Sequence, residues 1–244
     1  WISVFGYHWY AVWFSLSKCE LRRRWPVRAL ASVALSLVLV TTSVQFAANS
    51  LPLHEALFAR HNISERTGID EPDLTNVARE IRQYFNNDRE PLSAFAPVRG
   101  IATELFTTAE VAHMADVKNL FGRVQQVQRG AALFLVLLSL LTTVTLRRSS
   151  VGEISLWLRG GAGFTAVVIS TLGLISLLAF GPLFRLFHAL GFPQGNYVFD
   201  PRTSLLVGIF PFPFWQEITL AVGGMSLASA ALCWGVGYAL GRRG

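Results

Sequence analysis

Charged residues are scarce in this sequence, and cysteine is scarcer still. Asp, Glu, Lys and Arg make up 15% of the 244 residues, whereas a soluble domain carries about 25%. The two cysteines, Cys19 and Cys233, are too few for a disulfide framework. The sequence has no GxxxxGKS or GxxxxGKT phosphate loop, no CxxC pair and no HExxH metal motif. The low share of charged residues, together with 52% hydrophobic residues, excludes a disordered chain, a collagen-like fibre and most soluble enzymes.

Apolar residues take the place of the missing charges. Hydrophobic residues make up 52% of the chain, and a bilayer-spanning helix needs about 20 of them in succession. Four segments qualify, and no charge lies deep in any of them. They are residues 25–48, 130–146, 163–184 and 215–241. We therefore predict an all-α integral membrane protein with four transmembrane helices and a mostly helical extracytoplasmic loop domain.

Basic residues cluster at one end of these segments. Only Glu20 and Glu153 oppose them on that side, so the positive-inside rule predicts that this side is cytoplasmic. Loop 147–162, tail 242–244 and both ends of the four-span unit then lie inside. The basic residues are Lys18, Arg22, Arg23, Arg24, Arg28, Arg147, Arg148, Arg159, Arg242 and Arg243.

The first 24 residues combine an aromatic segment with a basic flank. Residues 1–17 (WISVFGYHWYAVWFSLS) are uncharged but slightly short for a span. They fit an interfacial segment or the tail of a further helix that begins upstream. They lack the basic region and small-residue cleavage site of a signal peptide.

Two regions are expected outside, residues 49–129 and 185–214. In the first, the spacing of apolar residues predicts helices over 51–60, 70–86 and 110–127, the last running into the second span. Asn86–Asp88, Pro91 and Pro97 predict a loop between the last two helices. In the second, the prolines of IFPFPFW at 209–215 argue for a re-entrant or interfacial element rather than a regular helix.

His113 stands between two carboxylates on a predicted helix. Glu110 and Asp116 lie three residues before and after it, on neighbouring turns of one broad face. Either carboxylate can orient the imidazole and stabilise its charged form. A solvated helix face gives the same pattern, and a metal site is the least favoured interpretation, so we expect no metal and no cofactor.

His188 follows the third span, at the expected outer membrane interface. Tyr197 can donate a hydrogen bond there, and an arginine can hold a phosphate or pair with Asp200. Ordinary interfacial anchoring also explains these residue types. The polar residues near His188 are Arg185, Asn196, Tyr197, Asp200 and Arg202.

Both histidines are expected on one face of the membrane, where lipid ester groups lie. Two imidazoles can divide the work of acyl transfer: one accepts a proton from the attacking group, and the other stabilises the oxyanion or protonates the leaving alcohol. If the two imidazoles share a lipid-accessible site, acyl transfer has a geometric basis.

Three motifs together resemble a known family. They are LFTTAEVAHMADVKNLF at 105–121, RLFHALGFPQGNYVFDP at 185–201 and an FPxxFW element at 210–215. With four spans around them, they are similar to the bacterial lipoprotein intramolecular transacylase family over roughly residues 25–241. The chain departs from the family pattern at Ser204 and Phe212, where acidic residues are expected.

The resemblance implies an enzyme of the bacterial cell membrane with an extracytoplasmic site. Family members move the sn-2 acyl chain of a diacylglyceryl lipoprotein to the amine of its N-terminal cysteine, giving a lyso-form lipoprotein. The implied partners are membrane lipid and a lipoprotein N-terminus. By motif, His113 and His188 are the catalytic pair, with Glu110, Asp116, Tyr197 and Asp200 in support. The expected substrate contacts are Arg185, Asn196, Arg202, Phe210 and Trp215.

Two other classes of function compete with this interpretation. One is a non-catalytic accessory subunit of a larger respiratory or photosynthetic membrane complex, because a homologue can keep its fold after losing its activity. The other is a transporter or channel, which the lack of ionisable residues at the middle of the spans disfavours. Nucleic-acid binding is less favoured still.

Overall fold

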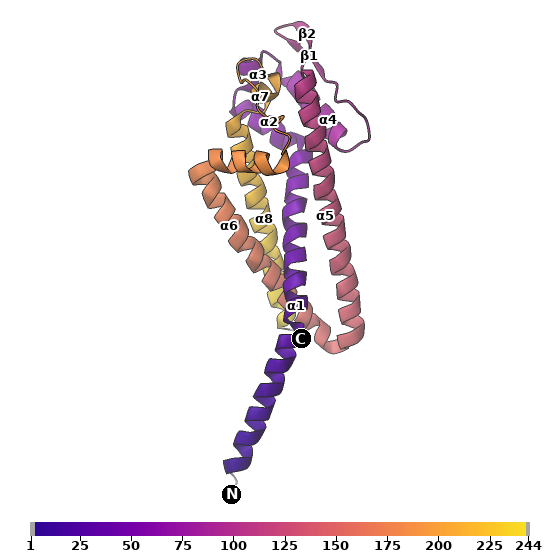
Figure 1. Ribbon diagram of the computed structural model, residues 1–244, viewed down its shortest axis with the longest axis vertical. Helices are drawn as coiled ribbons and strands as arrows, with labels where there is room; N and C mark the ends of the chain where they lie inside the picture. The colour runs from indigo at the N-terminus through magenta and orange to yellow at the C-terminus, as the bar shows by residue number, and fades with distance from the viewer. Residues whose placement is uncertain (1–2, 243–244) are drawn as a thin grey trace.

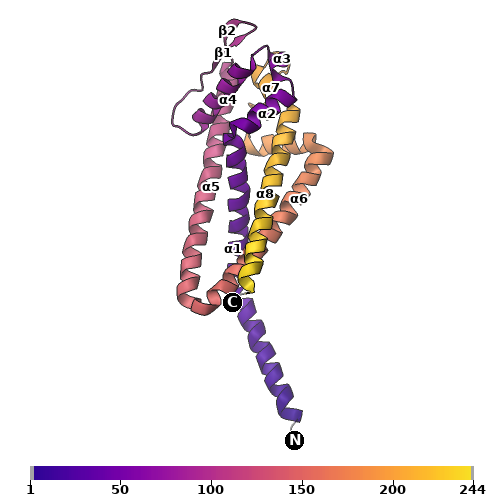
Figure 2. The same ribbon diagram turned by 180° about the vertical axis from the view of Figure 1, so that it is seen from behind.

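Long helices standing side by side dominate the computed structural model, which describes the backbone of residues 3–242 and the side chains of residues 24–242. A small domain sits on one end of them, and the C-terminus lies at the other end (Figures 1 and 2). We call the long helices from Arg24 onward the membrane body, and residues 50–107 and 192–211 the head. The long helices are α1 (Ser3–Asn49), α5 (Thr108–Leu146), α6 (Ser150–Gly191) and α8 (Phe212–Gly241).

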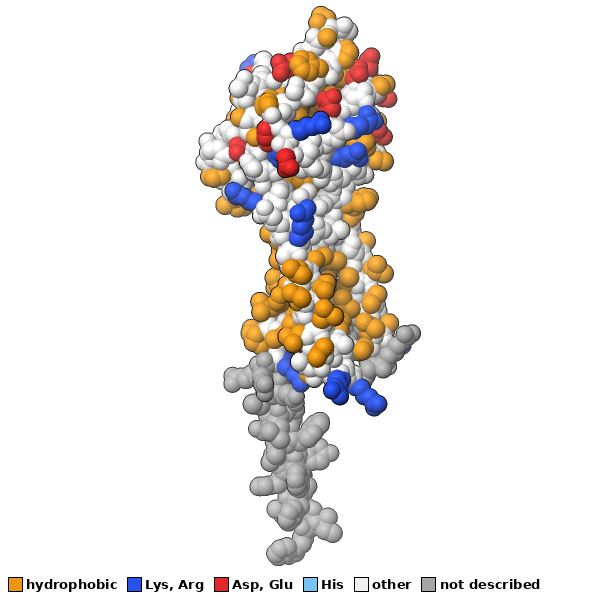
Figure 3. All heavy atoms as spheres, turned by 90° about the vertical axis from the view of Figure 1, so that its right-hand side faces the viewer, with side chains coloured by type: hydrophobic (Ala, Val, Ile, Leu, Met, Phe, Trp, Pro, Cys, Tyr) orange, Lys and Arg blue, Asp and Glu red, His pale blue; other side chains and the backbone are white. Residues whose placement is uncertain are grey.

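Three stretches of the described residues are long and apolar enough to cross a membrane: Arg24–Asn49, Thr108–Gly191 and Phe212–Gly241. The second, 84 residues long, contains α5 and α6, which run in opposite directions from the 3-10 turn η1 (Arg147–Ser149). Figure 3 shows apolar side chains covering the body, basic side chains at its far end, and mixed charges on the head. The body therefore has the surface of a membrane protein.

The helices of the body approach closely through small residues. A Cβ on Gly161 of α6 would lie 2.9 Å from the Ser32 carbonyl of α1 and 2.8 Å from the Leu35 side chain. Ser155 donates a hydrogen bond of 2.8 Å to the Gly237 carbonyl of α8. Small and hydroxyl side chains thus hold α1, α6 and α8 together, as is usual between helices in lipid.

Helix α6 bends before it reaches the head. Ala179 has non-helical backbone angles (φ −150°, ψ 46°), and Pro182 follows it within the helix. Pro182 lacks the N–H that would continue the helical ladder, which explains the kink. Residues 180–191 then run across the long axis of the molecule (Figure 1). The kink thus lies inside the expected third span, 163–184.

The head is built around a large-residue core. The amphipathic helix predicted over 70–86 is confirmed as α4, with Leu74, Val77 and Ile81 on its buried face. The helix predicted over 51–60 is confirmed as α2, and the third predicted helix is the start of α5, which continues without a break into the apolar segment. The short elements are α2 (Leu51–Arg60), α3 (Ile63–Thr67), α4 (Glu71–Phe85) and α7 (Leu205–Ile209).

Two sequence predictions need correction. The stretch around Pro97, expected to be a loop, forms an antiparallel hairpin of β1 (Phe95–Val98) and β2 (Ile101–Glu104). Its tight turn uses positive φ angles at Arg99 (51°) and Gly100 (79°), as two-residue hairpin turns require. The prolines of 209–215 begin a regular helix instead of preventing one: Pro211 is the N-cap of α8, and Pro213 lies in its first turn.

The N-terminal expectation lies partly outside the described residues. The backbone of α1 is helical from Ser3. The interfacial or spanning character of residues 1–17 depends on side chains that lie outside the described part of the chain.

Candidate functional site

His113 and His188 meet where the body joins the head. His113 lies in the second turn of α5, and His188 lies on the part of α6 that follows the kink. Their ring centroids are 6.3 Å apart, and their planes differ by 21°. The fold therefore brings the two predicted catalytic residues into one site.

Aromatic rings surround the histidine pair. Phe192 and Phe199 lie 4.8 and 5.7 Å from the His113 ring. Phe184 and Tyr197 lie 4.1 and 5.1 Å from the His188 ring. His113 is buried, with 8% of its surface exposed. Such a shell excludes water and disfavours a charge on either imidazole.

The hydrogen bonds of His188 indicate which nitrogen is available for chemistry. Its Nδ1 lies 2.8 Å from the carbonyl oxygen of Phe184, one helical turn earlier. A carbonyl only accepts hydrogen bonds, so we assign the proton of the neutral ring to Nδ1. Nε2 then keeps its lone pair and can accept a proton.

Asp116 and Asn196 form a polar pair beside His113. The Asn196 Nδ2 donates a 2.6 Å hydrogen bond to Asp116 Oδ2. The Asn196 Oδ1 and the His113 Nδ1 are both buried, and neither completes a hydrogen bond with any described residue. The Asn196 side chain nevertheless interacts with the His113 ring, so Asp116, Asn196 and His113 form one polar group inside the aromatic shell.

Glu110 has a different role from the one expected. Its Oε2 accepts hydrogen bonds from the backbone and hydroxyl of Thr107, at 2.7 and 2.8 Å, and completes a capping box at the start of α5. Its Oε1 accepts hydrogen bonds from the hydroxyl of Ser204 and from the backbone N–H of Leu206. Glu110 therefore ties α5 to α7 and does not orient His113; of its two flanking carboxylates, Asp116 remains the candidate for that role.

Asp200 and Arg202 lie on the surface. The Arg202 Nη2 is 2.9 Å from Asp200 Oδ2, and the Arg202 side chain is 86% exposed. The Arg202 guanidinium holds the pKa of the Asp200 carboxyl below its usual value. Arg185 is also exposed, on the segment of α6 that carries His188. Tyr197 therefore lies against His188. Asp200 and Arg202 form an ion pair with each other.

Phe210 packs against the aromatic rings where the head meets α8, and Trp215, which is 39% exposed, lies beside it. Phe210 lies 5.8 Å from Phe58 and 5.2 Å from Phe214, and Trp215 lies 6.0 Å from Phe210. Among the ring contacts of the described residues, neither reaches either histidine. Their expected role in substrate contact stays a prediction.

Sequence reasoning missed the aromatic rings that do line the pair. Phe184 and Phe192 lie four residues before and after His188, a helical spacing that could have revealed a shared face. Phe212, where an acid was expected, packs 5.6 Å from Phe184 and 4.9 Å from Phe180. Within residues 24–242, no three His, Cys, Asp or Glu side chains gather as a metal site would require.

These features define a class: a helical integral membrane protein with a paired-histidine site at the junction of the membrane body and the head. A family model described as lipoprotein intramolecular transacylase Lit matches residues 29–215. The chain belongs to this Lit family of lipoprotein intramolecular transacylases.

Solved structures agree with this fold. The chain is similar to the membrane-integral lipoprotein intramolecular transacylase Lit of Bacillus cereus, with a TM-score of 0.77 and 17% identity over 91% of this chain and 97% of that one. A variant of that protein with one histidine replaced by alanine matches with a TM-score of 0.73 and 16% identity, over 96% and 98% of the two chains. No curated protein matches the chain in sequence.

Family membership makes the chain a membrane-embedded acyltransferase that acts on lipoproteins. The predicted enzyme class is confirmed. The alternative of an accessory subunit in a larger complex has no support from the comparisons.

Proposed function

We propose that the histidine pair transfers the sn-2 acyl chain of a diacylglyceryl lipoprotein to the α-amine of its N-terminal cysteine. The observation that carries this proposal is the convergence of His113 and His188, with ring centroids 6.3 Å apart, in an aromatic shell. Nucleophile and ester belong to one molecule, so alignment supplies much of the acceleration, with effective molarities of roughly 10⁵–10⁸ M.

The hydrogen bonds support a definite division of labour. The His188 Nε2, free to accept because Nδ1 is held by the Phe184 carbonyl, takes a proton from the amine. The amine nitrogen attacks the ester carbonyl and forms a tetrahedral intermediate. The C–O bond to glycerol then breaks, and His188 returns the proton to the departing glycerol oxygen. Amide and free glycerol hydroxyl result, so the proton count balances.

His113 supports the intermediate in this scheme. It lies beside His188 and next to Asn196, which Asp116 holds through the 2.6 Å hydrogen bond. An N–H of His113 directed at the oxyanion would stabilise it in a water-poor site. Asp116 acts through Asn196 as a positioning residue.

Aromatic side chains beside the pair supply a surface for the acyl chain. Phe180, Phe184 and Phe212 pack edge to face or tilted, and 44% of the Phe212 side chain is exposed. Arg185 lies exposed on the same α6 segment and is the remaining candidate for a polar substrate contact.

The proposed setting is the cytoplasmic membrane of a bacterium, with four crossings. Helices α5 and α6 each supply one crossing within the long apolar stretch, and α1 and α8 supply the others. The arginines at the end opposite the head support an orientation with that end in the cytoplasm and the histidine pair on the outer face.

The test replaces each histidine by glutamine, which keeps a polar side chain but cannot shuttle the proton. His113→Gln and His188→Gln are each expected to lower the rate of lyso-lipoprotein formation by about 10²–10⁴-fold, measured by mass spectrometry of the lipoprotein N-terminus. The control is His61→Gln, because His61 lies in the head and pairs with Glu217. Full activity in both site variants would refute the proposal.

A further inference from the structure

The hairpin of the head leaves one edge of its sheet open. The backbone N–H of Leu105 donates to the Ala94 carbonyl at 3.0 Å, and bonded pairs in an antiparallel ladder recur at every second residue. The N–H and C=O groups of Ala102 and Glu104 therefore point away from β1. Both residues are exposed, and no hydrogen bond among residues 24–242 reaches these groups. We call this outer side of β2 the open edge.

The opposite edge of the hairpin, along β1, is protected. Pro97 lies directly across from Ala102, and it has no N–H to donate outward. Ala96 is buried in the core of the head, and the Arg99 N–H at the turn donates to the Gly68 carbonyl at 2.7 Å. The hairpin is thus fixed to the head through β1 and the turn, and its free backbone groups lie on β2.

Apolar side chains accompany the open edge. Ile101 in β2 is 71% exposed, and Phe95 in β1 is 61% exposed. The hairpin lies at the tip of the head, at the end farthest from the membrane body, so a bilayer around the body does not cover it (Figures 1 and 2). A strand added beside β2 would place its side chains next to Ile101, as cross-strand neighbours are placed in any sheet.

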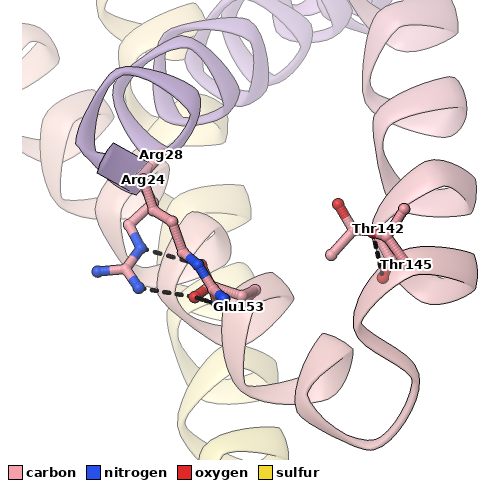
Figure 4. A network of polar contacts seen from close by, with 5 residues as sticks. All are labelled: Arg24, Arg28, Thr142, Thr145 and Glu153. Atoms are coloured by element: carbon pink, nitrogen blue, oxygen red, sulfur yellow. Dashed lines mark hydrogen bonds and ion pairs between the residues drawn. The ribbon is translucent and has the colours of Figure 1, made fainter. Parts of the chain in front are cut away.

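A polar cluster at the other end of the molecule shows the contrast. Arg28 donates to Glu153 through Nε at 2.9 Å and through Nη2 at 2.7 Å, and Arg24 donates through Nη1 at 3.1 Å (Figure 4). Those side chains meet one another and hold α1 against α6. The free groups of the open edge are backbone donors and acceptors at strand spacing, which an extended polypeptide matches and a lipid does not.

The position of β2 in the chain indicates which polypeptide is within reach. Leu105 and Phe106, both buried, connect β2 to the start of α5, and His113 follows in the second turn of that helix. Each residue adds about 1.5 Å in a helix and about 3.4 Å in an extended segment, so the Cα atoms of Ala102 and His113 are at most about 26 Å apart. An extended peptide that starts at the histidine pair covers this distance with about eight residues.

We propose that the open edge of β2 binds the polypeptide of the lipoprotein substrate, in extended form, a short distance after its lipidated cysteine. The proposal rests on the proposed acyl transfer, which places that cysteine at the histidine pair. The polypeptide adds a strand to the hairpin and exchanges backbone hydrogen bonds with Ala102 and Glu104. Backbone pairing does not depend on a particular side-chain sequence, so one edge serves lipoproteins of different sequence. Binding so far from the ester lowers KM for substrates that carry the segment.

The first test changes the substrate. The full chain in micelles is given a diacylglyceryl lipopeptide of about four residues or one of about sixteen, which is long enough to reach the open edge. Formation of the lyso-lipopeptide is followed by mass spectrometry. The long lipopeptide is expected to have a KM about tenfold lower, and N-methylation of alternate residues in its distal half is expected to abolish this advantage.

The outcomes of this test separate the two proposals. Equal KM values for the short, long and N-methylated lipopeptides would overturn binding at the open edge, while acyl transfer itself stands. No product from any of the three would overturn the proposed acyl transfer, and binding of the polypeptide with it.

The second test changes the protein. Ala102→Pro removes the outward N–H of the open edge and leaves the ladder bonds to β1 in place, because prolines are tolerated at such positions. The ratio of the two KM values is expected to fall from about tenfold to about one. The control is Ser93→Pro, at an exposed residue just before β1, which is expected to keep the ratio.

Three results of the second test would overturn the proposal. They are an unchanged ratio in Ala102→Pro, an equal loss of the ratio in Ser93→Pro, and loss of a dimer in Ala102→Pro without a change in KM, which would assign the open edge to a second copy of this chain. If Ala102→Pro does not fold, the N-methylated lipopeptide and the unaltered protein give the same comparison.

Discussion

The head and the membrane body bury opposite kinds of side chains. In the head, Ile63, Ile69 and Leu74 are at most 1% exposed. In the body, the side chains buried to that degree include Ser155, Thr165, Ser176 and Ser226, while Leu178 is 78% exposed. The head and the body therefore pack in different ways, and the histidine pair lies at the boundary between them.

The difference follows from the solvent on each side of that boundary. In water, burying a leucine side chain contributes about 1.5–3 kcal/mol. In lipid that gain is absent, because acyl tails are as apolar as leucine, and helices associate through close contact and hydrogen bonds. A core of large residues thus indicates an aqueous domain, and a core of small residues indicates a lipid-embedded one.

The largest expected effect comes from a leucine in the head. Leu74→Ala leaves a cavity in the water-facing core and is expected to lower the free energy of unfolding by about 2–5 kcal/mol. Leu178→Ala, at a side chain that faces lipid, is expected to change it little. The measurement is denaturant unfolding of the purified protein in micelles, and equal losses in both variants would break the comparison.

A smaller effect is expected from a glycine in the body. Gly161→Ala puts a methyl group within 3 Å of Leu35 and Ser32, and this overpacking is expected to cost about 1–3 kcal/mol. The matched control is Gly173→Ala, because a Cβ there meets nothing within 4 Å. Thermal unfolding that ranks Gly173→Ala below Gly161→Ala would show that small-residue contact does not hold α1 against α6.

A pH effect is expected from a buried histidine of the head. Burial lowers the pKa of His54 below its usual value of 6.5, and the ring packs between Phe58 and Phe214. As the pH falls below 6.5, the unfolded chain takes up the proton first, so stability decreases toward acid pH and is full above 6.5. In thermal melts between pH 5 and 8, His54→Gln is expected to flatten this dependence. An unchanged slope would assign it to other groups.

The smallest effect is expected at the exposed pair beside the site. Asp200→Asn removes the partner of Arg202, but both side chains lie in water, where such pairs contribute little. We expect unchanged lyso-lipoprotein formation and an unchanged melting temperature. A clear loss of activity with normal stability would return Asp200 to the substrate site.

The spacing of apolar residues in the sequence predicted the helices whose surroundings are mainly water or mainly lipid. The amphipathic helix α4 and the continuous helix α5 follow directly from apolar spacing. The kink at Ala179 could not be located in the same way, because Pro182 lies inside an unbroken apolar run. The short hairpin was missed because strands of four residues give little alternation, and Pro97 indicated a loop.

The candidate site could also be predicted only in part. The two histidine motifs indicated a shared site, and their spacing in the chain gave no measure of the distance between the rings. The Thr107 and Glu110 pair is a capping-box pattern, so the true role of Glu110 was readable from sequence, whereas its bond to Ser204 depends on tertiary contact. The link from Asp116 to Asn196 likewise joins segments that only the fold brings together.

The bend in α6 determines how the segment that carries His188 is oriented. His188 lies on a segment of α6 that runs crosswise to the rest of the bundle (Figure 1). Its position is set by that segment and by contacts with Phe192 and Tyr197. The kink at Ala179 therefore separates the direction of this segment from the direction of the straight part of the helix.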